Sequence, residues 1–155
     1  MLKRTKLNQI LAPCCLCLML YVIWGNSAMS GSQSSQMSGG VMELLERFFG
    51  SFQNVERATF LLRKAAHMTE FALLAFFLSW NGYLFLEPKV QTGALVLLLG
   101  LGTACVDETI QIFSAGRGSS LKDVWIDMAG FTLSFLLFRL VFRRARQRDR
   151  ASKTS

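Results

Sequence analysis

The sequence is poor in charged residues and in proline. Charged residues make up 17% of the 155 residues and only two residues are proline, whereas about 25% charged residues is usual in soluble domains. Hydrophobic residues reach 52%, and 13 residues are phenylalanine. Because a disordered chain needs low hydrophobicity, this composition excludes disorder. It also argues against an ordinary soluble enzyme, and the length fits a single domain.

The chain also lacks a basic patch with interleaved aromatic residues outside its apolar segments. Its net charge of +7 would by itself suit nucleic acid or an anionic membrane surface. Without such a patch, we expect no nucleic-acid partner. The basic residues instead gather before the first apolar segment and after the last. They are Lys3, Arg4, Lys6, Arg143, Arg144, Arg146, Arg148, Arg150 and Lys153.

Four apolar segments are each long enough to cross a bilayer, which takes about 20 residues. They cover residues 7–24, 65–86, 91–113 and 123–142. They predict an all-α, polytopic membrane bundle with four transmembrane helices. The positive-inside rule then places both termini in the cytoplasm. Residues 1–6 would be a cytoplasmic N-terminus, residues 7–142 the membrane domain, and residues 143–155 a basic cytoplasmic tail.

The first apolar segment could also be a signal peptide. Its charged start and the small residues Ser27 and Ala28 fit a signal sequence with a cleavage site. The apolar run is longer than the usual h-region, which favours an uncleaved transmembrane helix.

Two short breaks separate the later segments. Pro88 within Glu87-Pro88-Lys89 would kink a continuous helix, so the second and third segments are predicted to form a helical hairpin. Glycine and serine in residues 114–120 favour a turn before the fourth segment.

Residues 25–62 fall between the first and second segments and form the predicted outer loop. Residues 25–40 are rich in Ser, Gly, Gln and Met, which predicts a flexible loop. Residues 41–62 carry an apolar stripe at helical spacing, which predicts an amphipathic helix. That helix would lie on the outer membrane surface or pack against the bundle, and the pattern supports both equally.

Cysteine chemistry is not expected. Cys14 and Cys17 form a C-x-x-C pair with Cys15 between them, but the pair lies in an apolar segment and has no second pair beside it. These residues and Cys105 are predicted to act as small hydrophobic side chains.

Ionisable and polar residues within or beside the apolar segments are the most informative feature, because each charge inside a bilayer costs at least about 2.5–3.5 kcal/mol on insertion scales. Spacings of three and four residues place Arg63, His67 and Glu70 on one helix face, and the polar residues of the third and fourth segments have the same spacing. At about 1.5 Å per residue, they reach matching depths near the outer leaflet. The residues are Arg63, Lys64, His67, Glu70, Asp107, Glu108, Gln111, Asp123 and Asp127.

This convergence predicts one outward-facing polar site, joined by Arg117 from the loop after the third segment. His67 beside Glu70 would form an acid–base pair. The basic residues would hold a phosphate or another anion, and the acids could bind a divalent cation as cofactor. Alternatively, the groups pair among themselves and only hold the bundle together. The predicted catalytic residues are His67, Glu70, Asp107, Glu108 and Asp127, and the predicted substrate-binding residues are Arg63, Lys64, Gln111, Arg117 and Asp123.

Three motifs in this region resemble the VanZ-like family. Residues 63–71 resemble its R-K-x-x-H-x-x-E-aromatic motif, and residues 107–117 resemble its D-E-x-x-Q-x-F-x-x-G-R motif. Residues 123–130 are similar to its D-V-x-x-D/N-x-x-G motif. The order and spacing also match over residues 25–138, although Asn26-Ser27 departs from the more usual Phe-Ser.

The resemblance implies a small integral protein of the bacterial plasma membrane. The family is named after a member linked to teicoplanin resistance, and it has been grouped with membrane enzymes that act on lipid headgroups. Expected partners are therefore membrane lipids, a lipid-linked cell-wall precursor or a glycopeptide antibiotic.

Three functions remain open from the sequence. The first is an enzyme acting on a phosphate-bearing lipid, with His67 as general base. The second is a non-catalytic protein that binds or shields an envelope component. The third is a transporter or proton relay, which the position of the polar groups near one leaflet argues against.

Overall fold

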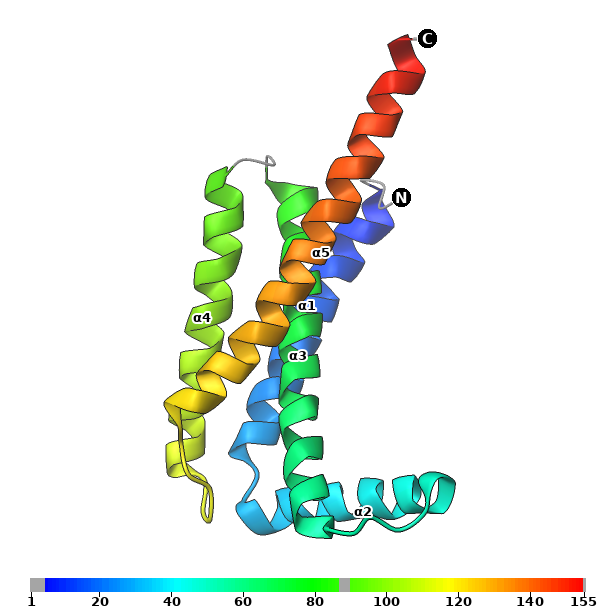
Figure 1. The fold of residues 1–155 in the computed structure, drawn as a ribbon. Helices are drawn as coiled ribbons and strands as arrows, with labels where there is room; N and C mark the ends of the chain where they lie inside the picture. Colours follow the sequence, from blue (N-terminus) through cyan, green and yellow to red (C-terminus); the bar gives the residue numbers. More distant parts are fainter. Residues whose placement is uncertain (1–4, 87–89, 155) are drawn as a thin grey trace.

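The computed structural model describes residues 5–86 and 90–154, with residues 143–154 described by their backbone alone. These residues form five α-helices and no strand, which confirms the all-α prediction (Figure 1). The helices are α1 (Lys6–Ala28), α2 (Gly31–Phe49), α3 (Val55–Phe85), α4 (Val90–Phe113) and α5 (Leu121–Thr154).

Within the described residues, three helical segments are long and apolar enough to cross a membrane. They are Lys6–Ala28, Val90–Phe113 and Leu121–Phe142. The sequence predicted a fourth at residues 65–86, inside α3, but α3 does not belong to this apolar set. Polar residues such as His67, Glu70 and Asn81 lower its apolarity. The three apolar helices mark the chain as a membrane protein.

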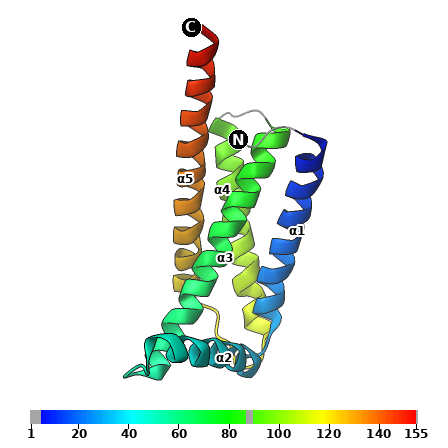
Figure 2. The same cartoon turned by 90° about the vertical axis from the view of Figure 1, so that its right-hand side faces the viewer.

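Four helices run alongside one another, and α2 lies across one end of the bundle (Figures 1 and 2). The start of α1 and the end of α5 both lie at the opposite end. Helix α3 contacts each of the other four helices. The long helix that is not among the three apolar segments therefore contacts every other helix of the bundle.

The core of the bundle is built where α1, α3, α4 and α5 meet. Ile23, Phe71, Leu74 and Phe131 are fully buried there. A Cβ atom at Gly100 would lie 2.4 Å from the Phe131 ring, so the absence of a side chain on α4 makes room for that ring.

The region between α1 and α3 differs from the prediction. Helix α1 continues to Ala28, and α2 begins at Gly31, where the sequence predicted a flexible loop. The cause is a capping box: Ser30 Oγ accepts from the Gln33 amide at 3.3 Å, and the Ser30 amide donates to Gln33 Oε1 at 3.0 Å. The Ser/Gln-rich composition suggested a loop, while the S-x-x-Q spacing marked a helix start.

The amphipathic helix predicted over residues 41–62 is in fact two pieces. Helix α2 ends at Phe49, because Gly50 adopts a φ of +85° in the left-handed region that favours glycine. Helix α3 begins at Val55, capped by the Asn54 side chain, which accepts from the Arg57 amide at 2.9 Å. The apolar stripe therefore crosses a break that its spacing alone did not reveal.

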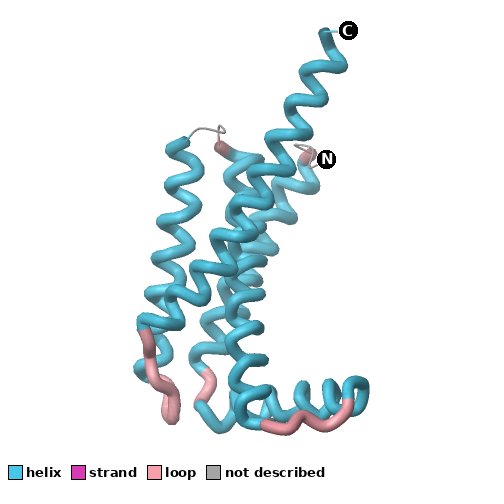
Figure 3. The backbone as a smooth tube through the Cα atoms, in the orientation of Figure 1, coloured by secondary structure: helices cyan, strands magenta, loops and turns pink. Residues whose placement is uncertain are grey.

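The connecting segments gather at the end of the bundle where α2 lies. The loops at residues 29–30, 50–54 and 114–120 are all found there (Figure 3). The predicted turn at residues 114–120 is confirmed. The predicted hairpin residues Glu87-Pro88-Lys89 lie outside the described residues, as do Lys3 and Arg4. Helix α5 continues to Thr154, through the segment predicted as a tail.

Candidate functional site

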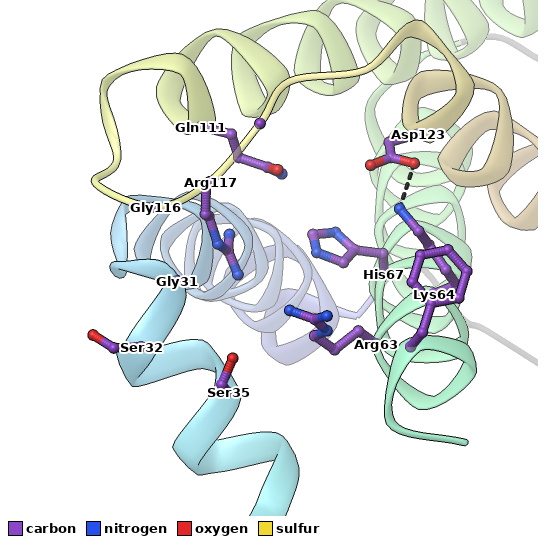
Figure 4. A pocket seen from close by; sticks show the side chains of 12 residues that line it. Gly31, Ser32, Ser35, Arg63, Lys64, His67, Gln111, Gly116, Arg117 and Asp123 are labelled. Atoms are coloured by element: carbon purple, nitrogen blue, oxygen red, sulfur yellow. Dashed lines mark hydrogen bonds and ion pairs between the residues drawn. The ribbon is translucent and has the colours of Figure 1, made fainter. Parts of the chain in front are cut away.

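A pocket of about 420 Å³ opens at this end of the bundle. It lies between the start of α2, the first turns of α3, the end of α4 and the loop that leads to α5 (Figure 4). Six of the ten predicted site residues line it: Arg63, Lys64, His67, Gln111, Arg117 and Asp123. The other lining residues are Gly31, Ser32, Ser35, Phe60, Gly116 and Gly118.

The lining of the pocket is cationic. Of the described residues that line it, Arg63, Lys64 and Arg117 carry fixed positive charge, and Asp123 carries a carboxylate. Lys64 Nζ forms an ion pair with Asp123 Oδ1. The side chains of Arg63 and Arg117 extend from different elements toward the same space beside His67 (Figure 4). The pocket therefore presents two guanidinium groups in addition to the Lys64–Asp123 pair.

Arg117 is held in place by α1 and α2. Its Nη2 donates to Ser34 Oγ at 2.7 Å, and its Nη1 lies 3.5 Å from the Ser27 carbonyl oxygen. Burial lowers the pKa of the Arg117 guanidinium, while the neighbouring Asp107 opposes that shift. Because a guanidinium stays protonated in proteins, Arg117 contributes a positive charge at neutral pH.

Behind the pocket lie three buried carboxylates. Asp107 is 0% exposed, Asp127 1% and Glu108 5%. Asp107 accepts hydrogen bonds from Ser27 Oγ at 2.6 Å and from Gln111 Nε2 at 2.9 Å. Glu108 Oε2 accepts from the Ser120 amide at 2.7 Å. These bonds tie α4 to the end of α1 and to the start of α5.

The partner of His67 differs from the expected one. Glu70, predicted to orient His67, accepts a hydrogen bond from Asn26 Nδ2 at 2.6 Å. The carboxylate opposite His67 is Asp127, with 4.0 Å between Nδ1 and Oδ1. Residue spacing within α3 suggested the Glu70 pair, whereas the actual neighbour comes from α5.

Three residues of the site were missed by sequence reasoning. Asn26, Ser27 and Ser34 bond to Glu70, Asp107 and Arg117 respectively. A signal was present for the first two, since Asn26-Ser27 occupies the Phe-Ser position of the family pattern. Ser34 had no signal, because it lay in the stretch predicted to be a flexible loop.

The bundle and its polar end define an all-helical membrane protein. Residues 14–143 match the VanZ/LLP1 family. That range holds the pocket and the buried carboxylates, and the chain belongs to the VanZ/LLP1 family. Comparison with curated proteins and with solved structures gives no match.

Proposed function

We propose that this protein binds the phosphate-bearing headgroup of a lipid or a lipid-linked cell-wall component in the pocket. The observation that carries the proposal is the convergence of the Arg63 and Arg117 side chains on one space, in a pocket that Lys64 also lines. Guanidinium groups recognise phosphate with paired, charge-assisted hydrogen bonds. A volume of about 420 Å³ falls within the roughly 300–1,000 Å³ range of small-molecule sites.

We further propose that the protein is a multi-pass protein of the bacterial plasma membrane with four crossings. Residues 65–86 of α3 would be the fourth span. The contacts of α3 with all four other helices support this, because polar side chains that face neighbouring helices need not meet lipid.

In this arrangement α2 is an interfacial helix at the outer surface. Phe48 and Phe49 at its end are 77% and 79% exposed, and Phe52 follows in the next loop. Exposed aromatic side chains at a bundle end are suited to the boundary between headgroups and acyl chains. The basic residues at both ends of the sequence favour a cytoplasmic location for the opposite end of the bundle. The pocket would then open toward the outer leaflet.

Chemistry on the bound headgroup and a role in resistance to teicoplanin-type glycopeptides belong to the same proposal. Binding or shielding of an envelope component without chemistry is the alternative. Headgroup chemistry predicts that an intact pocket changes the lipid composition of the cell, whereas binding or shielding predicts that it does not.

The test measures headgroup binding by the purified full-length protein. Native mass spectrometry detects how much phosphate-bearing lipid and how much uncharged diacylglycerol the protein retains. We expect Arg117→Gln and Arg63→Gln to weaken retention of the phosphate-bearing lipid about tenfold or more, since a hydrogen bond to a charged group contributes about 1.5–3 kcal/mol. The matched control is Arg57→Gln, an exposed arginine on the first turn of α3 that does not line the pocket.

Two results would contradict headgroup binding: equal retention by Arg117→Gln and Arg57→Gln, or equal retention of diacylglycerol. The same two variants, produced in cells, extend the test to function. If both the lipid profile and the teicoplanin susceptibility change in Arg117→Gln cells but not in Arg57→Gln cells, headgroup chemistry is supported. If the susceptibility changes in Arg117→Gln cells while the lipid profile stays the same, the shielding alternative is supported.

A further inference from the structure

His67, Asp107 and Asp127 bring potential metal-ligand atoms within 4.8 Å of one another. They come from α3, α4 and α5, so three helices converge at this point. The 4.0 Å between His67 Nδ1 and Asp127 Oδ1 is too long for a hydrogen bond. Two ligands that each lie about 2.0–2.2 Å from one ion are separated by roughly 3–4 Å. The three separations, each within 4.8 Å, therefore exceed this range by less than about 1 Å.

Asp127 has an unsatisfied carboxylate. The residue is 1% exposed, and neither of its oxygens has a hydrogen-bond partner among the described residues. Glu108 Oε1 is also buried without a hydrogen-bond partner among the described residues. Asp127 is in addition close enough to Asp107, Glu108 and Asp123 to be repelled by their negative charges. A buried, ionised carboxylate without a partner is costly, so this position needs a proton or a cation.

The balance of charge favours a divalent cation over a single proton. Lys64 is neutralised by Asp123. Arg63 and Arg117 then remain to offset the carboxylates that cluster at this end. The cluster consists of Glu70, Asp107, Glu108 and Asp127. With all four carboxylates ionised, the two guanidinium groups leave an excess of two negative charges, which one divalent ion offsets and one proton does not.

Asp107 is also oriented in the way that metal ligands are. Its two oxygens accept hydrogen bonds from Ser27 and Gln111, which fixes the plane of the carboxylate. Hydrogen bonds of this kind orient carboxylate ligands in metal sites and hold them ready for the ion. Each carboxylate oxygen keeps a further lone pair for coordination.

We propose that His67, Asp107 and Asp127 bind one divalent cation of the first transition row, with Mn²⁺ and Zn²⁺ as the ions that fit. One imidazole nitrogen and two carboxylate oxygens suit these ions better than Ca²⁺, which takes oxygen ligands alone. As a ligand, His67 does not serve as the general base that the sequence suggested.

The ion would lie next to the cationic pocket, because His67 belongs to both the pocket and the cluster, whereas Asp107 and Asp127 do not line the pocket. Three protein ligands leave at least one coordination position open. Contact between the ion and a phosphate oxygen rests on the proposed function, whereas binding of the ion itself does not.

The test uses Mn²⁺ and the full-length protein, purified in detergent without a histidine tag and stripped with EDTA. Mn²⁺ is the sharper probe, because thiolates such as those of Cys14, Cys15 and Cys17 compete for Zn²⁺ and not for harder ions. Binding is followed by the electron paramagnetic resonance signal of free Mn²⁺. We expect about one Mn²⁺ per chain, and at least about tenfold weaker binding in Asp127→Asn and His67→Gln.

The control is Glu56→Gln, which removes an exposed acid on the same helix as His67 and should bind Mn²⁺ as the wild type does. Circular dichroism and melting in EDTA monitor the fold of each variant, and Asp127→Asn should melt no lower than the wild type, since it removes a buried charge. A wild type that binds no Mn²⁺, or an Asp127→Asn that binds it unchanged, overturns the proposal.

Retention of phosphate-bearing lipid by the EDTA-treated protein is measured in parallel. If that retention persists while Mn²⁺ binding fails, only the metal inference is lost.

Discussion

Gly31 is the residue at which α2 meets the loop that carries Arg117. Its amide donates to the Ala115 carbonyl at 2.8 Å, and a Cβ atom at this position would lie 2.3 Å from the Gly116 carbonyl oxygen. Gly116 itself has a φ of +73°, in the region that favours glycine. Two backbones therefore touch where no side chain is present, and this contact positions Arg117 over the pocket.

Gly31→Ala should destabilise the protein and weaken headgroup binding. The added methyl group meets backbone that cannot rotate away, which costs about 1–3 kcal/mol. Thermal melting in detergent measures the loss. Gly39→Ala is the matched control, because it lies on the same helix with nothing within 4 Å of its Cβ position and gains about 1 kcal/mol from helix propensity. If Gly31→Ala melts at the same temperature as Gly39→Ala or at a higher one, the contact between Gly31 and the Gly116 backbone does not contribute to stability.

Much of the candidate site could be predicted from the depth of residues along each helix. Counting residues from the predicted cytoplasmic ends of the segments placed the polar side chains at one end of the bundle, and they lie together at one end. The pairings could not be predicted in the same way, because they depend on how each helix is rotated against its neighbours. His67 meets Asp127 of α5, and Glu70 meets Asn26 of α1. Both contacts join residues that are far apart in the sequence.

At the scale of elements, the site depends on the close packing of α3 against α5. A Cβ atom at Gly130 would lie 2.2 Å from the Met68 carbonyl oxygen, so the two backbones are in direct contact. The turns next to this contact carry Asp127 on α5 and His67 on α3. One turn further lie Asp123 and Lys64, which form the ion pair at the pocket wall.

Gly130→Ala should therefore push α5 away from α3 and open both pairs. We expect a loss of stability of about 1–3 kcal/mol, as for other overpacked contacts, together with weaker headgroup binding. Unfolding in a denaturing detergent measures the first effect and native mass spectrometry the second. Gly102→Ala on α4, with open space around its Cβ position, should leave headgroup binding unchanged and lose no stability, since helix propensity favours alanine by about 1 kcal/mol. Equal behaviour of the two alanine variants would argue against this contact as the one that sets the site.

The helices could be predicted wherever apolar runs are long, as in α1, α4 and the first part of α5. Prediction failed for the first half of α2, because that half is rich in Ser, Gly and Gln. Those residues disfavour a helix by intrinsic propensity, and a capping box together with contacts to the Arg117 loop overrides that preference. The end of α2 at Gly50 was hidden because the apolar stripe continues into α3.

At the scale of the whole molecule, the position of α3 decides how many times the chain crosses the membrane. In the part of the chain that the structure describes, three helical segments are apolar enough to span a membrane, and α3 is not one of them. Yet α3 runs alongside the others and contacts all of them (Figure 2). A bundle with α3 in the bilayer puts the two ends of α3 on opposite sides. Without α3 in the bilayer, its polar groups would face water. Helices α1, α4 and α5 would then lack the helix that packs against each of them.

Cysteine labelling decides between these arrangements. In a background where Cys14, Cys15, Cys17 and Cys105 are replaced by serine, single cysteines are placed at the two ends of α3. Ser51→Cys, in the exposed loop before α3, should react with a membrane-impermeant maleimide in intact cells. Leu86→Cys, at the C-cap of α3 and 41% exposed, should react only after the cells are permeabilised. Thr5→Cys is the reference for the side of the N-terminus, and it should behave like Leu86→Cys. Labelling of both Ser51→Cys and Leu86→Cys in intact cells would show that α3 does not cross the membrane and would contradict the four-span arrangement. Labelling of Ser51→Cys only after permeabilisation would contradict the outward-facing pocket.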